Sequence, residues 1–386
     1  MRYKALVYML SSVGVALSAT VAGAAESGAS QPSTAAKATV AATPQSPAVA
    51  KVTLYDDFTA STLNHAIWDK NFNATQTFGS AYWSPTQVAT GASHLRLIVK
   101  KQAGYGKAYV SGAVTSFGGF SQTYGRYEIR ARLPPGKGMW PAFWLMPIDQ
   151  SWPPEIDVFE WVASDPTAVY NTLHWQSNNS HYQKSGICHS STLTTADHTY
   201  GVDWTPGRLD FTLDGKICSS LTGSNVPSKP VYVLMNLAIG GSWPGEPDAT
   251  TPLPGTFAIR WVKVSQFVGM PAEVPLPLMF GKTYLSAYQV KAGTTIQINT
   301  SAVVGNKALG KVSARAEVYG INNSVNHGRT AYIQKANTKA GERIPFTFSY
   351  TVPTGMAPGL YSVAINLVGG SYNKSQWIAN QFFVVK

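Results

Sequence analysis

The segment Tyr124-Gly-Arg-Tyr-Glu-Ile-Arg-Ala-Arg-Leu133 alternates apolar and polar side chains. A period of two places the apolar side chains on one face of a β-strand and the polar ones on the other. The same pattern recurs in Val52-Thr-Leu-Tyr55, His94-Leu-Arg-Leu-Ile-Val-Lys100, Leu209-Asp-Phe-Thr-Leu213 and Ile259-Arg-Trp-Val-Lys-Val264. These short strands predict β structure on both sides of the opening segment.

Composition supports an all-β chain. The 386 residues include 11 Trp, 19 Tyr and 34 Gly, whereas charged residues make up only 13%, against about 25% in an average soluble domain. Aromatic strands that are punctuated by glycine and carry few charges are typical of sandwiches and barrels. The length exceeds that of one ordinary domain.

The amino terminus has the order of a secretory signal. Arg2 and Lys4 precede an apolar stretch that ends near Val21, and small residues follow up to Ala25. We therefore predict a signal peptide over 1–25 and a secreted protein, extracellular or periplasmic. A membrane anchor is the alternative, but Ser and Gly dilute the apolar stretch, and no later segment has the pattern of a membrane span.

Two domains are expected beyond the signal. Residues 26–50 are rich in Ala, Ser, Thr and Pro and predict a disordered linker. The first domain is expected over 51–270, and a Pro-rich joint over 271–277. Short strands over 278–386 predict a smaller accessory sandwich, similar to immunoglobulin or fibronectin domains, which could bind polysaccharide.

Charge is concentrated in the second domain. The chain has a net charge of +11, and residues 271–386, with eight Lys, three Arg and three Glu, carry +8 of it. Such a domain should attract polyanions, although it could equally be a merely soluble basic domain. Nucleic acid is a poorer fit, because export is expected and no clustered basic motif is present.

The two cysteines, Cys188 and Cys218, predict one structural disulfide. An exported domain with two thiols more often bridges them than uses them for metal binding or catalysis, since a structural zinc site needs four closely spaced ligands. Two unpaired buried thiols are the alternative.

The segment Pro153-Pro-Glu-Ile-Asp-Val-Phe-Glu-Trp161 brings together three of the few acidic residues. Strand alternation places Glu155 and Asp157 on one face but sends Glu160 to the other. One β-bulge between Asp157 and Glu160 would return Glu160 to the acidic face. The two glutamates would then lie about 13–14 Å apart along the strand, and side chains leaning together could reach the ~5–5.5 Å of a retaining glycosidase.

Three adjacent carboxyl groups cannot all ionise freely. A proton shared by Asp157 with a neighbour would keep the pKa values apart, one low for a nucleophile and one high for a general acid. A solvated acidic strand edge, or a cation site, is the alternative that spacing alone leaves open.

Five segments together resemble glycoside hydrolase family 16. In chain order they are Trp140-Pro-Ala-Phe-Trp-Leu-Met146, Glu155-Ile-Asp-Val-Phe-Glu160, Thr172-Leu-His-Trp175, His198-Thr-Tyr-Gly-Val-Asp-Trp204 and Met235-Asn-Leu-Ala-Ile-Gly-Gly-Ser-Trp-Pro-Gly245. The resemblance implies a curved β-jelly-roll with a substrate cleft on its concave sheet. It also implies a retaining double displacement in which Glu155 is the nucleophile, Asp157 assists it and Glu160 is the general acid/base.

The resembling segments also contain candidate substrate contacts. Indole planes suit the apolar faces of sugar rings, and amide or imidazole groups can bind hydroxyls. The candidates are Trp140, Trp144, His174, Trp175, Asn236 and Trp243, and about two of the four tryptophans are expected to contact sugar. Trp204 has the pattern of a core residue.

No cofactor and no catalytic metal are expected, because the reaction needs only carboxylates. Many members of the resembling family bind a structural calcium ion, to which Asp56, Asp57 and Asp203 could contribute, although these residues show no calcium-loop pattern.

The bulged motif and the segment from Asn236 to Gly245 most resemble those of bacterial β-1,3- or mixed β-1,3-1,4-glucanases. The resemblance therefore implies an endo-acting hydrolase of such a glucan, which we expect to work as a monomer. Four alternatives stay open: a glycanase that trims a secreted acidic exopolysaccharide similar to succinoglycan, a galactanase, a transglycosylase, and a carbohydrate-binding protein without turnover. The presence of both Glu155 and Glu160 disfavours the last of these. A purely structural envelope protein is a further class, which only the second domain favours.

Overall fold

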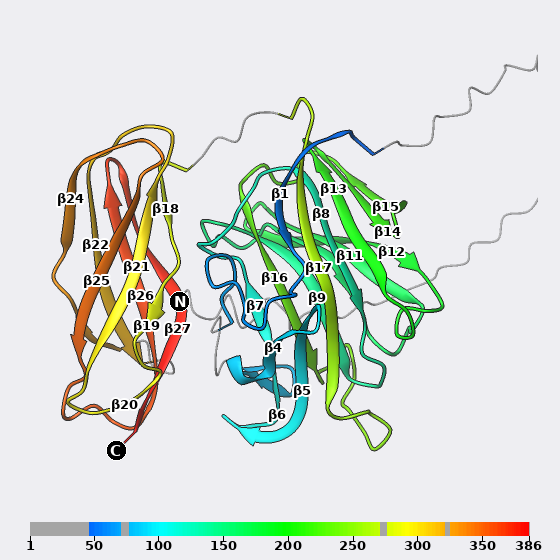
Figure 1. Cartoon of the computed structure of the whole chain (residues 1–386), viewed down its shortest axis with the longest axis horizontal. Helices are drawn as coiled ribbons and strands as arrows, with labels where there is room; N and C mark the ends of the chain where they lie inside the picture. Colours follow the sequence, from blue (N-terminus) through cyan, green and yellow to red (C-terminus); the bar gives the residue numbers. More distant parts are fainter. Residues whose placement is uncertain (1–45, 71–76, 271–275, 321–324, 386) are drawn as a thin grey trace, which may run out of the picture.

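The computed structural model describes residues 46–70, 77–270, 276–320 and 325–385. Within them the regular secondary structure is almost entirely β-strand, as predicted, and the chain forms two β-sandwich bodies (Figure 1). The predicted signal peptide lies outside the described residues, as does most of the predicted joint. Val49 and Ala50, assigned to the linker, belong instead to the first strand, in which Val49 pairs with Phe267 on the last strand of the first domain.

The first domain stacks two sheets. The larger sheet has the order β15 (Lys216–Thr222), β14 (Arg208–Leu213), β13 (His198–Thr205), β8 (Gly125–Arg132), β17 (Gly255–Phe267), β5 (His94–Gly104), β6 (Lys107–Ser111), β3 (Ala81–Trp83) and β2 (Thr77–Phe78). β1 (Val49–Asp56) pairs with β17, and β4 (Val88–Gly91) pairs with β5 after a 3-10 turn, η1 (Pro85–Gln87).

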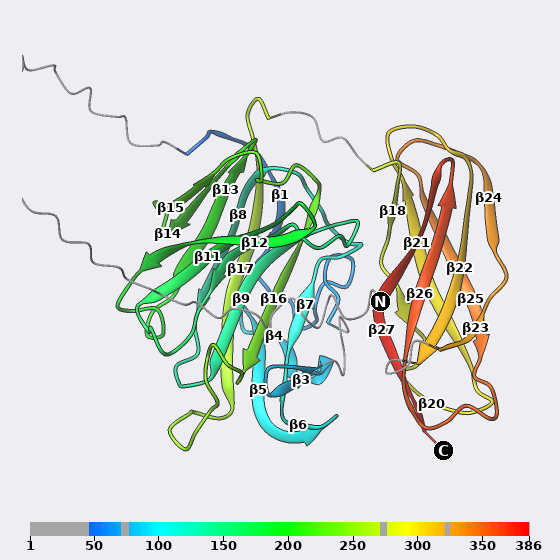
Figure 2. The same ribbon diagram turned by 180° about the vertical axis from the view of Figure 1, so that it is seen from behind.

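The second sheet of this domain has six strands. Its order is β12 (Ser180–His189), β11 (Ala168–Ser177), β10 (Glu155–Glu160), β9 (Met139–Pro147), β16 (Val231–Ile239) and β7 (Ala113–Thr115). Figure 2 shows β7 and β16 on the side that faces the second domain. All of these strand pairs are antiparallel.

The core of the first domain lies between its two sheets. Phe159 on β10 contacts Tyr200 on β13 and Phe257 on β17, with ring centroids 4.3 and 5.9 Å apart. Trp204 is fully buried, as predicted for a core residue. Because the core takes one face of the six-stranded sheet, only the opposite face is left for polar chemistry. We call that opposite face the acid face, after the carboxylates described below.

The second domain is a smaller sandwich. One sheet contains β18 (Leu278–Phe280), β21 (Thr295–Val304), β19 (Tyr284–Leu285) and β25 (Arg343–Thr351). The other contains β20 (Gln289–Lys291), β27 (Tyr372–Val385), β26 (Gly359–Gly369), β22 (Gly310–Gly320), β23 (Asn326–Arg329) and β24 (Ile333–Thr338). The apolar–polar alternation of Arg343–Thr351 buries every second side chain, as a two-layer fold requires.

The two domains contact each other beside β7. Phe117, which follows β7, and Tyr232 on β16 belong to one apolar cluster with Leu278 and Phe280 of the second domain. The ammonium group of Lys282 donates hydrogen bonds to the backbone carbonyls of His65 and Trp68. The second domain is therefore docked on the first rather than only tethered to it.

The predicted disulfide is present. Cys188 on β12 is bonded to Cys218 on β15, so the bridge joins one edge of the six-stranded sheet to one edge of the larger sheet. The closed loop spans a sequence separation of 30 residues. Within the described parts of the chain, no helix has the length and hydropathy needed to cross a bilayer.

We expect the Cys188→Ser/Cys218→Ser double variant to lose about 3–4 kcal/mol of unfolding free energy, because a loop of this length restricts the unfolded chain. Urea unfolding with and without reductant measures the difference. A double variant as stable as the oxidised wild-type protein would contradict a structural role for the bridge.

Candidate active site

A β-bulge in β10 places the three carboxylates. On β11, Asp157 pairs with Thr172 and Glu160 with Tyr170, so three steps along β10 match two steps along its neighbour. The register with β9 is interrupted at the same place. Val158 and Phe159 both belong to the core cluster, and Glu160 returns to the acid face, where it lines a pocket with Asp157. This is the bulge that the spacing of the acidic residues predicted.

The carboxylate of Glu155 accepts a hydrogen bond from one indole N–H group. Its Oε2 atom accepts a 2.8 Å hydrogen bond from Nε1 of Trp152. Its Oε1 atom is buried and accepts no hydrogen bond from an N–H or hydroxyl group of the described residues, although the neighbouring Asp157 carboxyl group can share a proton with Glu155. The residue is only 1% exposed. A buried carboxylate oxygen without a hydrogen bond is costly, and a nucleophile needs such a free oxygen.

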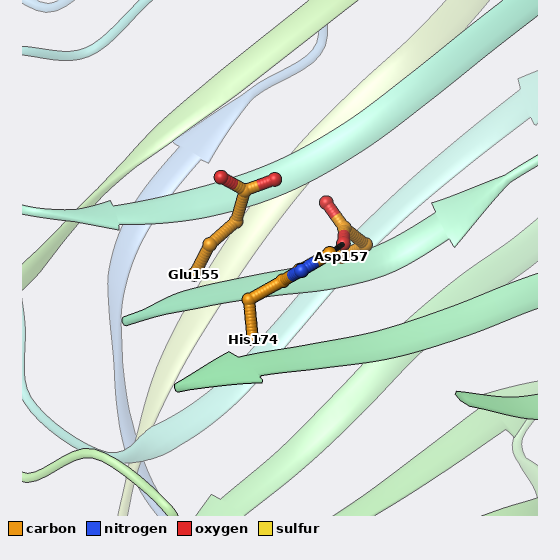
Figure 3. A group of neighbouring side chains, drawn as sticks. All are labelled: Glu155, Asp157 and His174. Atoms are coloured by element: carbon orange, nitrogen blue, oxygen red, sulfur yellow. Dashed lines mark hydrogen bonds and ion pairs between the residues drawn. The ribbon is translucent and has the colours of Figure 1, made fainter. Parts of the chain in front are cut away.

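Glu160 and Asp157 have partners of different kinds. Oε1 of Glu160 accepts a 2.9 Å hydrogen bond from Nε1 of Trp140. Oδ2 of Asp157 lies 3.0 Å from Nε2 of His174 on β11. Figure 3 shows Asp157 between Glu155 and His174, with one of its oxygens toward each. Asp157 can therefore exchange a proton with either neighbour.

Burial raises the pKa values of all three acids. It is the largest cause for each of them, and for Asp157 it raises the pKa to about 7. The neighbouring carboxyl groups raise the pKa of Glu155 and of Glu160 further, whereas His174 and the indole N–H groups of Trp152 and Trp140 lower them. At neutral pH the group therefore holds at least one proton.

An aromatic pocket lies beside Asp157 and Glu160. Besides Asp157 and Glu160 it is lined by Phe78, Trp140, Ala142, Trp144 and Asn236. Nε1 of Trp144 donates a 2.8 Å hydrogen bond to Oδ1 of Asn236, which fixes both side chains. Trp243 packs edge-on against Trp140, with centroids 5.3 Å apart. Four of the six predicted substrate contacts therefore gather at this pocket.

The other two predicted contacts, His174 and Trp175, are adjacent on β11 and point to opposite faces. His174 reaches Asp157 on the acid face. Trp175 is on the other face, packs against the sandwich core and stacks on Tyr182. Alternation along β11 dictates this separation, so the prediction that Trp175 lines the cleft is wrong.

Three residues near the acids were not among the predicted contacts: Phe78, Trp152 and His181. His181 is brought to His174 by the hairpin between β11 and β12, in which Ser177 pairs with Ser180. The turn residues Asn178 and Asn179 both have positive φ, as a two-residue hairpin requires. That Asn-Asn pair was the signal in the sequence that could have located His181.

Glu155, Asp157 and His174 form the group of potential metal ligands in the described residues, with ligand atoms within 4.8 Å of one another. Two ligands of a tetrahedral zinc ion stand about 3.4 Å apart, because each bond is near 2.1 Å. The 3.0 Å contact between His174 and Asp157 is instead a hydrogen bond between the two side chains. We therefore interpret the group as acid–base machinery.

The suggested calcium ligands Asp56, Asp57 and Asp203 do not belong to the group of potential metal ligands found among the described residues. Oδ1 of Asp57 accepts hydrogen bonds from the backbone and hydroxyl groups of Thr59. Both carboxylate oxygens of Asp203 accept hydrogen bonds from Arg126, at 2.6 and 2.8 Å. Asp56 accepts from Nε1 of Trp68 and from the backbone of Phe58. Each group is thus used inside the fold.

The first domain, which contains the three carboxylates, is similar to known glycoside hydrolases. Residues 73–263 match the model of the glycosyl hydrolases family 16. This region of the chain is a family 16 domain. The domain is 40% identical over 141 residues to the endo-1,3-1,4-beta-glycanase ExsH of Rhizobium meliloti, covering 35% of this chain and 29% of that protein. It is 32% identical over 187 residues to a beta-glucanase of Rhodothermus marinus, covering 42% and 64%.

The fold is shared as well. The structure of the laminarinase from Rhodothermus marinus matches with a TM-score of 0.52 and 27% identity, over 56% of this chain and 98% of that one. This chain spans less than a third of ExsH and under two thirds of the Rhodothermus beta-glucanase. The match to the laminarinase structure confirms the jelly-roll predicted for the first domain.

The bulge makes a direct prediction for two single-residue deletions. Removing Val158 should leave Glu155, Asp157 and Glu160 on the acid face, because the remaining residues alternate regularly. Removing Ile156 should turn Glu155 away from Asp157. Both residues are buried and apolar, so the two deletions are matched.

We expect the Val158 deletion to keep activity on β-glucan within about a hundredfold of wild type, and the Ile156 deletion to lose it. Reducing-sugar release from folded protein, with circular dichroism as the check on folding, distinguishes them. Equal activities in the two deletions would contradict the assignment of faces.

The raised pKa of Asp157 makes a prediction about stability. The folded state binds this proton more tightly than the unfolded state, so the carboxyl group destabilises the fold as pH rises from about 4 through about 7. Asn cannot ionise and can still accept a hydrogen bond from His174. Asp157→Asn should therefore raise the free energy of unfolding at pH 8, on the order of 2 kcal/mol, and change it little at pH 4.

Urea unfolding at the two pH values measures this gain. A gain of the same size at pH 4 and pH 8 would show that Asp157 ionises as freely in the folded protein as in the unfolded one.

Proposed function

We propose that the chain is a secreted, retaining endo-β-glucanase that hydrolyses internal linkages of β-1,3- or β-1,3-1,4-glucan. The observation that carries the proposal is the buried Oε1 of Glu155, to which no N–H or hydroxyl donor is bound, on the same face of β10 as Asp157 and Glu160, which line an aromatic pocket. The relatives support the substrate class, since their names are endo-1,3-1,4-beta-glycanase and beta-glucanase.

In the first step Oε1 of Glu155 attacks the anomeric carbon, and the bond from that carbon to the leaving oxygen breaks. Glu160 gives its proton to the leaving oxygen, which departs as a sugar hydroxyl. Burial and the neighbouring carboxyl groups raise the pKa of Glu160, which favours the protonated form that a general acid needs. The hydrogen bond from Trp140 fixes the direction in which the carboxyl group points.

In the second step the glycosyl ester on Glu155 is hydrolysed. Glu160, now a carboxylate, takes a proton from water, and the water oxygen attacks the same carbon. Two inversions return the original anomeric configuration. Asp157 assists by holding a proton near Glu155, which reduces the repulsion between the two carboxylates.

The aromatic pocket supports a carbohydrate substrate. The flat faces of Trp140, Trp144 and Trp243 suit the apolar faces of sugar rings, and Asn236 offers its amide to a hydroxyl group. Because Trp140 also hydrogen-bonds Glu160, a ring stacked there would lie next to the proton donor. We infer a monomer, since every side chain assigned a role comes from one chain.

An acidic exopolysaccharide is the second candidate substrate. Two endo-1,3-1,4-beta-glycanases of Rhizobium meliloti, at 40% and 42% identity, support a glycan with mixed β-1,3-1,4 linkages. The +8 charge of residues 271–386 would favour an anionic polymer on the docked second domain. An exported protein is supported by the disulfide and by the signal-like amino terminus.

We expect Glu155→Gln to lower kcat on β-glucan by about 10⁴-fold or more with an unchanged fold, because an amide cannot act as the nucleophile. Glu128→Gln is the matched control, since Glu128 is also buried but lies on β8 and pairs with Lys263. It should keep wild-type activity.

Products from laminarin, lichenan, an acidic exopolysaccharide and agarose, compared side by side, identify the substrate. Internal cleavage of laminarin or lichenan supports the proposal, and preference for the acidic polymer supports the second candidate. Turnover by Glu155→Gln at the wild-type rate would contradict both.

A further inference from the structure

A second histidine extends the acid group toward solvent. Nδ1 of His174 lies 2.9 Å from Nε2 of His181 on β12, and the two imidazole rings are nearly parallel, with an interplanar angle of 14°. His174 is buried, whereas His181 is exposed. Asp157, His174 and His181 therefore form a continuous line of hydrogen bonds from the buried carboxyl group to the surface, the inner part of which is visible in Figure 3.

Each hydrogen bond in this line needs one proton, and this couples the two rings. If His174 donates through Nε2 to ionised Asp157, its Nδ1 is bare and must accept from Nε2–H of His181. If Asp157 is protonated and donates to Nε2 of His174, then His174 carries its proton on Nδ1 and donates to a bare Nε2 of His181. The protonation state of Asp157 thus sets the tautomers of both neutral rings.

The proposed reaction creates a need for such a line. Glu155 changes from a carboxylate to a neutral glycosyl ester and back in each cycle. The charge on Glu155 is one of the influences that favour a proton on a neighbouring carboxyl group. The proton affinity of Asp157 should therefore fall when the ester forms and rise again when the ester is hydrolysed, so that Asp157 loses a proton and later regains it.

A proton cannot easily reach Asp157 from the cleft. The pocket beside Asp157 is lined mainly by the apolar groups of Phe78, Trp140, Ala142 and Trp144, and the bound polysaccharide would cover it. The line through His174 leaves the site in the other direction, toward the edge strand β12.

We propose that His181 and His174 carry a proton between solvent and Asp157 during each catalytic cycle. A solvent proton binds Nδ1 of His181, its Nε2 proton passes to Nδ1 of His174, and the Nε2 proton of His174 passes to Oδ2 of Asp157. Both rings end neutral with the opposite tautomer, and one proton has been delivered. The reverse sequence removes it. This inference rests on the proposed function of the site.

The titratable groups that neighbour His181 and His174 in this line lie on β10 and β11. Glu155, Asp157 and Glu160 on β10 lie at its inner end, and their charges favour delivery of a proton. His174 on β11 acts on His181, whose pKa is lowered first by burial and then by this neighbour. Trp152, which packs against the His181 ring at 4.8 Å, is uncharged. The lowered pKa keeps His181 neutral at pH 7, as a relay of alternating tautomers requires.

The kinetic test uses His181→Ala in the full-length protein, with His189→Gln as the matched control. His189 is also on β12 and exposed, but it lies at the far end of the strand from His174. We expect His181→Ala to lower kcat about tenfold with little change in KM, and to lose activity most where proton delivery limits the rate, at high pH. Added imidazole should restore kcat, because it can occupy the vacated position.

A purely structural role would give a loss that imidazole does not restore. Wild-type kcat in His181→Ala across the pH range, or a loss without rescue, would overturn the relay. Turnover of β-glucan by the wild-type protein in the same assay tests the proposed function. The effect of His181→Ala on that turnover tests the relay, so the two proposals can be contradicted separately.

A second measurement needs no substrate. Imidazole ¹⁵N shifts of the free protein should show His174 and His181 exchanging tautomers together as Asp157 gains its proton. His189 should show no such change. Tautomers of His174 and His181 that stay fixed, or that change at unrelated pH values, would contradict the coupling on which the relay depends.

Discussion

The β-bulge between Asp157 and Glu160 is the constraint on which the site of this sequence depends, because two apolar residues, Val158 and Phe159, stand in succession between these acids. A regular strand would direct Glu160 into the sandwich core, where Phe159 now packs against Tyr200 and Phe257. With the bulge, two apolar side chains fill the core in succession and three carboxyl groups share one face. The same local irregularity therefore serves the packing of the fold and the chemistry of the cleft.

Collecting these acids in a buried position opposes folding. Their pKa values rise because solvent is excluded and because the charges repel. Indole N–H donors from Trp140 and Trp152 and the imidazole of His174 offset part of that cost. What remains is a group that holds protons at neutral pH, which is the property that acid–base catalysis requires. The loss in stability and the gain in reactivity have one cause.

The second domain lies closer to this site than a tethered module would. Tyr232 on β16 belongs to the apolar cluster that includes Leu278 and Phe280, and the charge of Glu155 contributes to the raised pKa of Tyr232. The docked domain thus shares packed side chains with the acid face. A basic domain held there would add positive potential beside the polymer as well as binding area.

Much of this could be predicted from alternation alone. The strand pattern located the sheets, and the spacing from Glu155 to Glu160 predicted the bulge, because only one extra residue could restore Glu160 to its face. Alternation places His174 and Trp175 on opposite faces, whereas the family resemblance made both of them candidate contacts. His181 was missed because it depends on the register of a hairpin. Docking of the second domain was missed because linker composition does not encode an interface.

The stereochemistry of the first product tests the central claim most directly. If the bulge brings Glu155 and Glu160 together for a double displacement, proton NMR during the first minutes of laminarin hydrolysis should show the β-anomer of the new reducing end before mutarotation. Initial appearance of the α-anomer would mean that water attacks directly, and would contradict the role assigned to Glu155.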